Sequence, residues 1–307
     1  MSLMNTRSRM KAQCEAQCVL RNVSEESIKI SPIFQAQRYN LRPRKGTTLG
    51  IDDDYASEIH DYHRSRESST AVDPGYILNP AILIDETMRQ ILVNYLVEWH
   101  DRFGLAPETL FSTVSIVDRY LASEDTAVTK NNLQLVGIAA LLIASKFEEE
   151  VPLQLSDAVY ICPPQNEKEI VKMERTILTV LKYEIYVPNA YVFLRRYLTA
   201  SNATTEVANL ANYILDGTLQ SFYLLNFLPS QLAAAAIFIS RKTMGVTAWC
   251  PALVQHARYK DREVLSVARA VIAVKTYCSA GLYAVNKKYA TTKYGRVSQT
   301  ITLCSDF

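Results

Sequence analysis

"GIAALLIASK", residues 137–146, and "AAAAIFISRK", residues 233–242, are two stretches rich in small residues that lie 96 positions apart. Each has the length and pattern of a helix. Alanine and glycine let neighbouring helices approach closely, which is typical of a helix at the centre of a helical domain. A repeat at this distance predicts two similar compact domains, each built around one central helix.

The segments around both centres are also helical in pattern. Apolar residues recur at i, i+3, i+4 and i+7, as at Met88, Ile91, Leu92 and Tyr95, which is the spacing of one helical face. Pro188 interrupts the pattern between two sets of five stretches. The first set covers 85–103, 107–123, 130–148, 153–161 and 166–183, and the second covers 189–200, 204–224, 229–244, 248–257 and 261–283. We therefore expect an all-α fold.

The domain boundaries follow from composition and charge. The first 50 residues carry nine Lys or Arg against three Glu, which predicts a disordered basic tail. "DDDYASEIHDYHRSRE" (52–67) predicts a short helix, with acids at the end that the helix dipole favours. The predicted divisions are the basic tail (1–51), N-terminal helix and linker (52–80), first five-helix domain (81–187), second five-helix domain (188–285) and C-terminal tail (286–307).

Composition argues against several classes of protein. The chain has 307 residues, is 49% hydrophobic and carries a net charge of +2, so it offers large cores but no general basis for binding nucleic acid. Its longest apolar run, "LVGIAALLIA" (135–144), is about half the ~20 residues that a membrane span needs. It contains neither a Gly-rich phosphate loop nor a recognisable nucleophile motif. We expect no membrane, no nucleic acid, no cofactor and no catalytic residue.

The stretch "TMRQILVNYLVEWHDRF" (87–103) is apolar on two faces. Beside the stripe that begins at Met88, a second stripe contains Val93, Leu96 and Val97, with Arg89 at its head. A surface helix usually has one apolar stripe. We expect the stripe with Arg89 to face inward, where a buried charge needs a partner because it is costly alone.

Four strings of the first domain resemble the first cyclin box of A- and B-type mitotic cyclins: "MRQILVNYLVEWHDRF", "ETLFSTVSIVDRYL", "LQLVGIAALLIASKFEE" and "KMERTILTVLKYEI". The match runs in order from about Tyr55 to Tyr186. "FLRRYL" and "LPSQLAAAAIF" resemble the second box more loosely. "TVSIVDRYL" and "AYVFLRRY" look B-type, whereas "LVEW" and "KFEE" look A-type, so the resemblance is to a mitotic cyclin that leans toward the B-type. The resemblance implies two tandem five-helix cyclin boxes preceded by a short N-terminal helix.

The resemblance also implies a function. The chain is expected to be a regulatory subunit, not an enzyme, that binds and activates a cyclin-dependent Ser/Thr kinase in mitotic progression and helps recruit substrates. The family's kinase contacts fall on Lys146 and Glu174, expected on one exposed face, and on Phe147, Tyr55, Ile59, Tyr62 and Tyr183. The apolar face of a helix as short as 52–67 needs something to dock on.

The resemblance assigns roles to both stripes of 87–103. Arg89 is expected to pair with Asp118 of the "DR" motif, linking the first two helices. The other stripe corresponds to the family's docking patch for Arg-x-Leu peptides in substrates or inhibitors, and we expect it to be partly exposed. Its residues are Met88, Ile91, Leu92, Tyr95, Glu98 and Gln134, with Tyr95 standing where the family usually has Trp. The alternative is a helix that is buried on both sides within a large core.

The basic tail carries two short motifs. "RYNL" (38–41) has the Arg38-x-x-Leu41 core of a destruction box, which predicts recognition by ubiquitin-ligase machinery. "LRPRKG" (41–46) is a basic cluster compatible with nuclear import. We expect the protein in the nucleus and the cytoplasm.

The same residues offer a few other candidate sites and one other function. Two pairs of residues each offer two metal ligands, Cys14 with Cys18 and His60 with His63, but neither has a second pair at zinc-site spacing. We therefore interpret the cysteines as part of the tail and the histidines as part of a solvated helix face. Arg195 matches one member of a phosphate pocket found in some B-type cyclins, but Ala208 and Asn212 replace the others, which argues against that pocket. The alternative function is a cyclin-fold nucleic-acid-binding transcription factor, which would need a basic face.

Overall fold

The computed structural model describes residues 53–78, 83–123, 126, 128–163, 165–277 and 283–304. Within these ranges it contains thirteen α-helices, three short 3-10 helices and no β-strand, which confirms the predicted all-α fold. The described residues form two compact units, one of residues 75–185 and the other of residues 53–74 together with 186–304. The predicted tail (1–51), including Arg38 and Leu41, lies outside the described residues.

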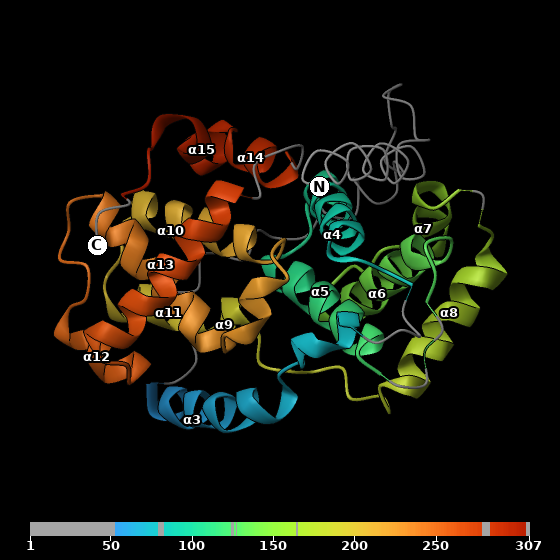
Figure 1. Cartoon of the computed structure of the whole chain (residues 1–307), viewed down its shortest axis with the longest axis horizontal. Helices are drawn as coiled ribbons and strands as arrows, with labels where there is room; N and C mark the ends of the chain where they lie inside the picture. Colours follow the sequence, from blue (N-terminus) through green and yellow to red (C-terminus); the bar gives the residue numbers. More distant parts are fainter. Residues whose placement is uncertain are drawn as a thin grey trace, which may run out of the picture. The chain divides into compact units, whose positions relative to one another are not determined.

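The first unit is built around one central helix. Its helices are α4 (Glu86–Phe103), α5 (Pro107–Leu121), α6 (Leu133–Glu148), α7 (Leu155–Ile161) and α8 (Glu167–Val180). The small-residue helix α6 packs against α4, α5, α7 and α8 (Figure 1). Most of α6 is therefore buried, and its exposed residues begin only at its last turn, with Lys146 and Phe147.

Local sequence signals fix where these helices begin and end. The Asp85 carboxylate accepts a hydrogen bond from the Met88 N–H at 2.8 Å and starts α4. Gly104 ends α4 in the left-handed conformation (φ 59°), which glycine adopts without steric strain. At the start of α8, the Asn166 side chain accepts from the Glu169 N–H, and the Glu169 carboxylate accepts from the Asn166 N–H. This reciprocal capping box holds the first turn of α8 in place.

Gly137 lets α4 and α6 pack closely. A Cβ atom at this position would lie only 2.7 Å from Leu92 Cδ1, closer than van der Waals contact allows. Leu92 is accordingly wholly buried. The expectation that Leu92 is partly exposed is wrong, because the face of α4 that carries it packs into α6 rather than facing solvent.

Arg89 and Asp118 join α4 to α5 through a buried two-pronged contact. Arg89 Nε donates to Asp118 Oδ1 and Arg89 Nη2 to Asp118 Oδ2, each at 2.7 Å. The Tyr76 hydroxyl, from the 3-10 helix η1 (Pro74–Leu78), donates to the same Oδ1 at 3.0 Å. Burial, and then the Asp118 charge, raise the pKa of Tyr76 well above its usual value, so its hydroxyl keeps the proton that it donates.

The second unit repeats the same plan. Its helices include α3 (Asp53–Thr70), α9 (Ala190–Ala200), α10 (Thr205–Thr218), α11 (Pro229–Thr243), α12 (Pro251–Ala257) and α13 (Asp261–Tyr277). The alanine-rich α11 packs against α9, α10, α13 and α3 (Figure 1). The helix that precedes the first unit in sequence, α3, thus belongs to the second unit in space.

Glu67 fastens α3 to the first turn of α11. Its carboxylate accepts hydrogen bonds from the backbone N–H of Ser230 at 3.1 Å and from the Ser230 hydroxyl at 2.9 Å. The first N–H groups of a helix have no partner within the helix, so Glu67 caps α11 from a distant part of the chain. Arg64 Nη1 lies 3.2 Å from Glu67 Oε1 and so balances the charge of the buried carboxylate. The same nitrogen donates to Tyr259 Oη at 2.6 Å.

His60 and His63 lie on the buried face of α3, so their interpretation as part of a solvated face is wrong. His60 Nε2 donates to the backbone carbonyl of His256 at 2.9 Å, and His63 Nε2 shares a hydrogen bond with the Tyr186 hydroxyl at 2.6 Å. Both imidazoles also meet the Phe193 ring edge to face. The two histidines are therefore packing residues.

The stability of the second unit should fall in mild acid because of His60. Burial, aided by nearby Arg196, Arg64 and Arg258, lowers the pKa of His60 to about 4. In the unfolded chain His60 becomes protonated below pH ~6.5, whereas in the folded chain it does so only near pH ~4. The free energy of unfolding therefore falls as the pH is lowered from ~6.5 to ~4. We expect a loss of about 2 kcal/mol between pH ~7 and pH ~5.

The measurement is the free energy of unfolding at both pH values. The matched variant is His60→Gln, whose amide can still donate to the His256 carbonyl but does not titrate. It should lose less stability than the natural chain over this interval. An identical loss in both proteins would show that His60 does not carry the effect.

The C-terminal segment is part of the second unit. Helices α14 (Ala284–Tyr289) and α15 (Val297–Thr300) pack against α10. Lys288 Nζ lies 2.7 Å from Asp216 Oδ2, with both side chains buried, and the Tyr289 hydroxyl donates to the same oxygen at 3.0 Å. The sequence predicts this segment only as a tail from residue 286; the structure shows that it covers α10.

Two negative findings apply to the described residues alone. Among the helices described, none is both long and apolar enough to cross a membrane. The same residues contain no group of three or more His, Cys, Asp or Glu side chains that could hold a metal ion.

Candidate functional site

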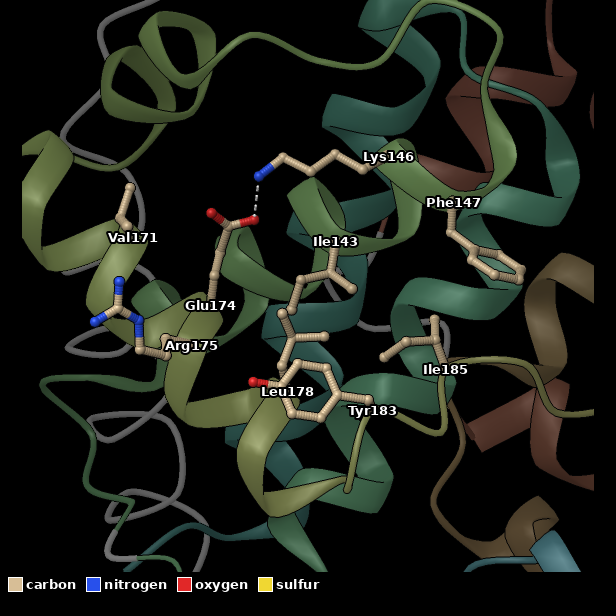
Figure 2. Close-up of a pocket in the computed structure, with 9 residues that line it drawn as sticks. All are labelled: Ile143, Lys146, Phe147, Val171, Glu174, Arg175, Leu178, Tyr183 and Ile185. Atoms are coloured by element: carbon tan, nitrogen blue, oxygen red, sulfur yellow. Dashed lines mark hydrogen bonds and ion pairs between the residues drawn. The ribbon is translucent and has the colours of Figure 1, made fainter.

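The first unit contains a cavity of about 390 Å³ on the outer side of α6 and α8. Three segments supply its walls: the end of α6, one face of α8 and the chain that follows α8 (Figure 2). The lining residues are Ile143, Lys146, Phe147, Val171, Glu174, Arg175, Leu178, Tyr183 and Ile185. Four residues predicted as kinase contacts (Lys146, Phe147, Glu174 and Tyr183) are thus brought together.

The α8 wall follows from helical spacing. Val171 and Arg175 are four residues apart, as are Glu174 and Leu178, so each pair lies on the same side of α8. Next to Glu174 around the helix, Ile170 and Ile177 are wholly buried in the unit. The cavity wall therefore runs from the edge of the buried stripe, at Glu174, to the exposed side of α8, at Val171 and Arg175.

Lys146 and Glu174 form an ion pair at the rim of the cavity. Lys146 Nζ donates to Glu174 Oε1 at 2.6 Å, and their side chains are 51% and 9% exposed. The two residues share one face as expected, but the expectation that both are exposed is wrong for Glu174. The end of α6 holds Lys146 outward, whereas Glu174 stands beside the buried side of α8 and is covered by its neighbours.

The chain after α8 makes a strained turn that places Tyr183 at the cavity. Lys182 (φ 52°) and Tyr183 (φ 59°) are both left-handed although neither is glycine, which costs about 1–3 kcal/mol for each residue. The Tyr183 N–H donates to the Leu178 carbonyl at 2.9 Å and closes the turn. As a result Tyr183 is 67% exposed and Phe147 is 52% exposed, so both side chains can be reached from solvent.

The remaining predicted kinase contacts lie on α3, in the second unit. Tyr55, Ile59 and Tyr62 are all exposed. They lie on the face of α3 next to the histidines that pack against the second unit, and the Tyr62 hydroxyl accepts a hydrogen bond from Arg66 at 3.0 Å. The docked helix therefore presents an apolar face that its own unit does not cover.

The predicted docking patch on α4 is mostly buried. Ile91 and Tyr95 are buried like Leu92, and Met88 is half-buried, so the expected partial exposure is wrong for Ile91 and Tyr95. The Tyr95 hydroxyl donates to the Ile161 carbonyl and accepts from Gln134 Nε2 at 3.0 Å. These bonds tie the Tyr95 ring to α7 and α6.

The polar residue of the patch already has a partner. Glu98 Oε1 lies 2.6 Å from Arg102 Nη2 on the next turn of α4, and both side chains are about one third exposed. A peptide arginine would compete with Arg102 for this carboxylate. Peptide docking at α4 stays a prediction.

Five cavity residues were not predicted from the sequence. They are Ile143, Val171, Arg175, Leu178 and Ile185. The signal for three of them was present, because Val171, Arg175 and Leu178 lie three, one and four positions from Glu174 along a helix. The cavity as a whole combines an apolar lining with a charged rim, which suits an apolar segment of a partner protein that brings polar groups to one edge.

Comparison with known proteins identifies the family. Residues 58–186 match the family model described as "Cyclin, N-terminal domain", and residues 188–303 match "Cyclin, C-terminal domain". Over 249 residues the chain is 37% identical to G2/mitotic-specific cyclin-1 of Medicago sativa subsp. varia, which covers 78% of this chain and 56% of that protein. Over 254 residues it is 34% identical to G2/mitotic-specific cyclin-2 of Medicago sativa, covering 82% and 76%.

Other relatives agree with this assignment. Cyclin-B2-2 of Oryza sativa subsp. indica is 35% identical over 245 residues, or 79% of this chain and 58% of that protein. The chain thus spans little more than half the length of two of these three relatives. The solved structure of a viral cyclin from herpesvirus saimiri superposes with a TM-score of 0.63 at 20% identity, covering 74% of this chain and 99% of the viral one, which shows the shared fold. The chain therefore belongs to the cyclin family, and within it is similar to G2/mitotic-specific and B-type cyclins.

Proposed function

We propose that the chain is a regulatory subunit that binds and activates a cyclin-dependent Ser/Thr kinase during mitotic progression. The observation that carries this proposal is the cavity of the first unit, with its Lys146–Glu174 pair. The family and its mitotic relatives supply the class of partner. The proposed role is binding and activation, without catalysis by this chain.

The ion pair is arranged to bind backbone groups of the partner. The Lys146 ammonium has three N–H donors and uses one on Glu174 Oε1, and the second Glu174 oxygen can accept a further bond. Because the two groups meet at 2.6 Å, both can form hydrogen bonds with the same exposed stretch of the partner's backbone. Unsatisfied backbone groups of this kind occur at helix ends.

The apolar residues supply the rest of the binding energy. Phe147 and Tyr183 expose aromatic rings beside the ion pair, and aromatic side chains contribute strongly when a partner removes them from water. On α3, Tyr55, Ile59 and Tyr62 offer a second apolar surface. We propose that the kinase contacts both surfaces.

The alternative, a nucleic-acid-binding transcription factor, gains no support. The rim of the cavity carries both charges, whereas phosphate binding needs a concentration of cations. The family relatives described above are cyclins named for mitosis or as B-type.

Three further roles remain proposals. Recruitment of Arg-x-Leu substrates or inhibitors rests on the position of the α4 patch. Recognition by ubiquitin-ligase machinery rests on Arg38 and Leu41, and a location in the nucleus and the cytoplasm rests on the basic cluster 41–46. Both of these motifs lie outside the described residues.

Reconstitution tests the main proposal. The chain is mixed with individual purified cyclin-dependent kinases, and phosphorylation of a protein substrate is measured. We expect a stable one-to-one complex and activity at least ~100-fold above that of the kinase alone, because a shift from mostly inactive to mostly active kinase spans this range. Failure to bind or to activate any member of the panel would refute the proposed function.

A further inference from the structure

Arg175 is the charged residue of the cavity that the proposed function leaves unexplained. It lies one position after Glu174 on α8 and is exposed. Figure 2 shows its guanidinium beside Val171, beyond Glu174 as seen from Lys146. Lys146 and Glu174 neutralise each other, whereas the guanidinium of Arg175 has no hydrogen bond or ion pair with the rest of the described chain. The cavity rim therefore carries one uncompensated positive charge.

An uncompensated arginine at this place favours a particular chemistry in the partner. A segment that fills the cavity shields the rim from water, which strengthens the field of the remaining charge. Guanidinium matches a carboxylate through two parallel N–H···O bonds. The chemistry that fits the site is therefore an acidic side chain at the edge of the bound segment.

The position of this acid follows from its neighbour. The second oxygen of Glu174 can accept hydrogen bonds from backbone N–H groups of the partner, and N–H groups without internal partners occur at the N-terminus of a helix. Asp and Glu are favoured in the first turn of a helix because they complement its dipole. A carboxylate in that first turn would lie next to the N–H groups that bind Glu174. Arg175 follows Glu174 on the same turn of α8, so its guanidinium would be close to this carboxylate.

We propose that Arg175 is a specificity contact, which pairs with an Asp or Glu side chain in or just before the first turn of the kinase helix that docks in the cavity. This inference rests on the proposed function. It adds that a negative charge on the kinase helps to decide which kinases bind. A kinase with a neutral or basic residue at this point would bind more weakly.

Three substitutions at one position separate charge from size. Dissociation constants are measured with a purified, unphosphorylated cyclin-dependent kinase that binds the natural chain. Arg175→Gln should weaken binding about three- to fivefold, as expected for loss of a partly exposed ion pair. Arg175→Glu should weaken it ~10-fold or more because like charges then meet. Arg175→Lys, which keeps the charge, should stay close to the natural chain. The differences should shrink in ~0.5 M salt.

The matched control is Lys172→Glu. Lys172 is exposed on α8 but does not line the cavity, so the variant makes the same change in net charge outside the proposed contact. It should bind the kinase as the natural chain does. On the kinase side, replacing the acids of the docking helix by Lys, one at a time, should restore binding to Arg175→Glu for one of them.

The outcomes are distinct. If Arg175→Glu binds normally, or if Lys172→Glu is weakened equally, Arg175 is not a specificity contact, although kinase binding stands. If no kinase acid restores binding to Arg175→Glu, the proposed carboxylate is refuted. Because the kinase is unphosphorylated, a phosphate group cannot account for a positive result. If the natural chain binds no cyclin-dependent kinase, the proposed function falls and this inference with it.

Discussion

Replacing Lys146 and Glu174 together by alanine should abolish kinase activation while the chain stays folded. Moving a kinase from mostly inactive to mostly active requires roughly 5 kcal/mol of preferential binding. Two charge-assisted hydrogen bonds of about 1.5–3 kcal/mol each supply much of that energy. Both residues must be replaced, because Lys146→Ala alone would leave the covered Glu174 carboxylate without its cation. The measurement is phosphorylation of a protein substrate, with the melting temperature of the free variant as the test of folding.

A second pair on the same helix provides the control. Glu167 and Lys172 are exposed on α8 and do not line the cavity. Replacing both by alanine removes one acid and one base, as in the first variant, and should leave activation near that of the natural chain. Normal activation by the Lys146/Glu174 variant would remove the basis for assigning the kinase contact to this pair.

The largest effect on stability is expected from Arg89. Arg89→Ala removes both hydrogen bonds that Arg89 makes to Asp118 and leaves this carboxylate buried beside the Tyr76 hydroxyl, without a compensating cation from α4. Breaking a buried ion pair by removing one partner costs about 3–5 kcal/mol, a large share of the roughly 5–15 kcal/mol that stabilises a domain. The measurement is denaturant unfolding of the chain without any kinase.

Two further variants make the interpretation specific. Arg89→Lys keeps the charge but cannot make the two-pronged contact, so its loss should be smaller than that of Arg89→Ala. The double variant Arg89→Met with Asp118→Leu removes both charges and should recover part of the stability. A loss below about 1 kcal/mol for Arg89→Ala would contradict a structural role for the pair.

The arrangement of each unit could be predicted because the signals are local. The small residues of 137–146 and 233–242 mark the two central helices, and Pro107 and Pro229 occupy first turns of α5 and α11. Hydrophobic periodicity then places the starts of the surrounding helices to within three residues, although α10 ends at Thr218 rather than at the predicted 224. By contrast, the burial of Leu92 depends on Gly137, which comes from another helix. Nothing within 87–103 distinguishes a stripe that packs on α6 from one that faces water.

The site was partly predictable for the same reason. The resemblance located Lys146 and Glu174, but it did not reveal that Glu174 would be covered, since this depends on how α8 lies against α6. The role of His60 and His63 was missed because their partners, His256 and Tyr186, are far away in sequence. Two polar residues three positions apart look like a solvated face until the opposing surface is known.

The docking of α3 on the second unit also has a consequence for biosynthesis. Its partners Ser230 and His256 follow Glu67 and His60 by 163 and 196 residues, which a ribosome adds in roughly 10–40 s at ~5–20 residues per second. During this interval the whole first unit is synthesised and can fold. The first turn of α11, which Glu67 caps, and the surface against which His60 and His63 pack have not yet been made. A ribosome paused before Ser230 would thus carry a finished first unit and an unsupported helix of marginal stability. The second unit closes only when α3, its earliest segment, meets the much later helices that carry Ser230 and His256.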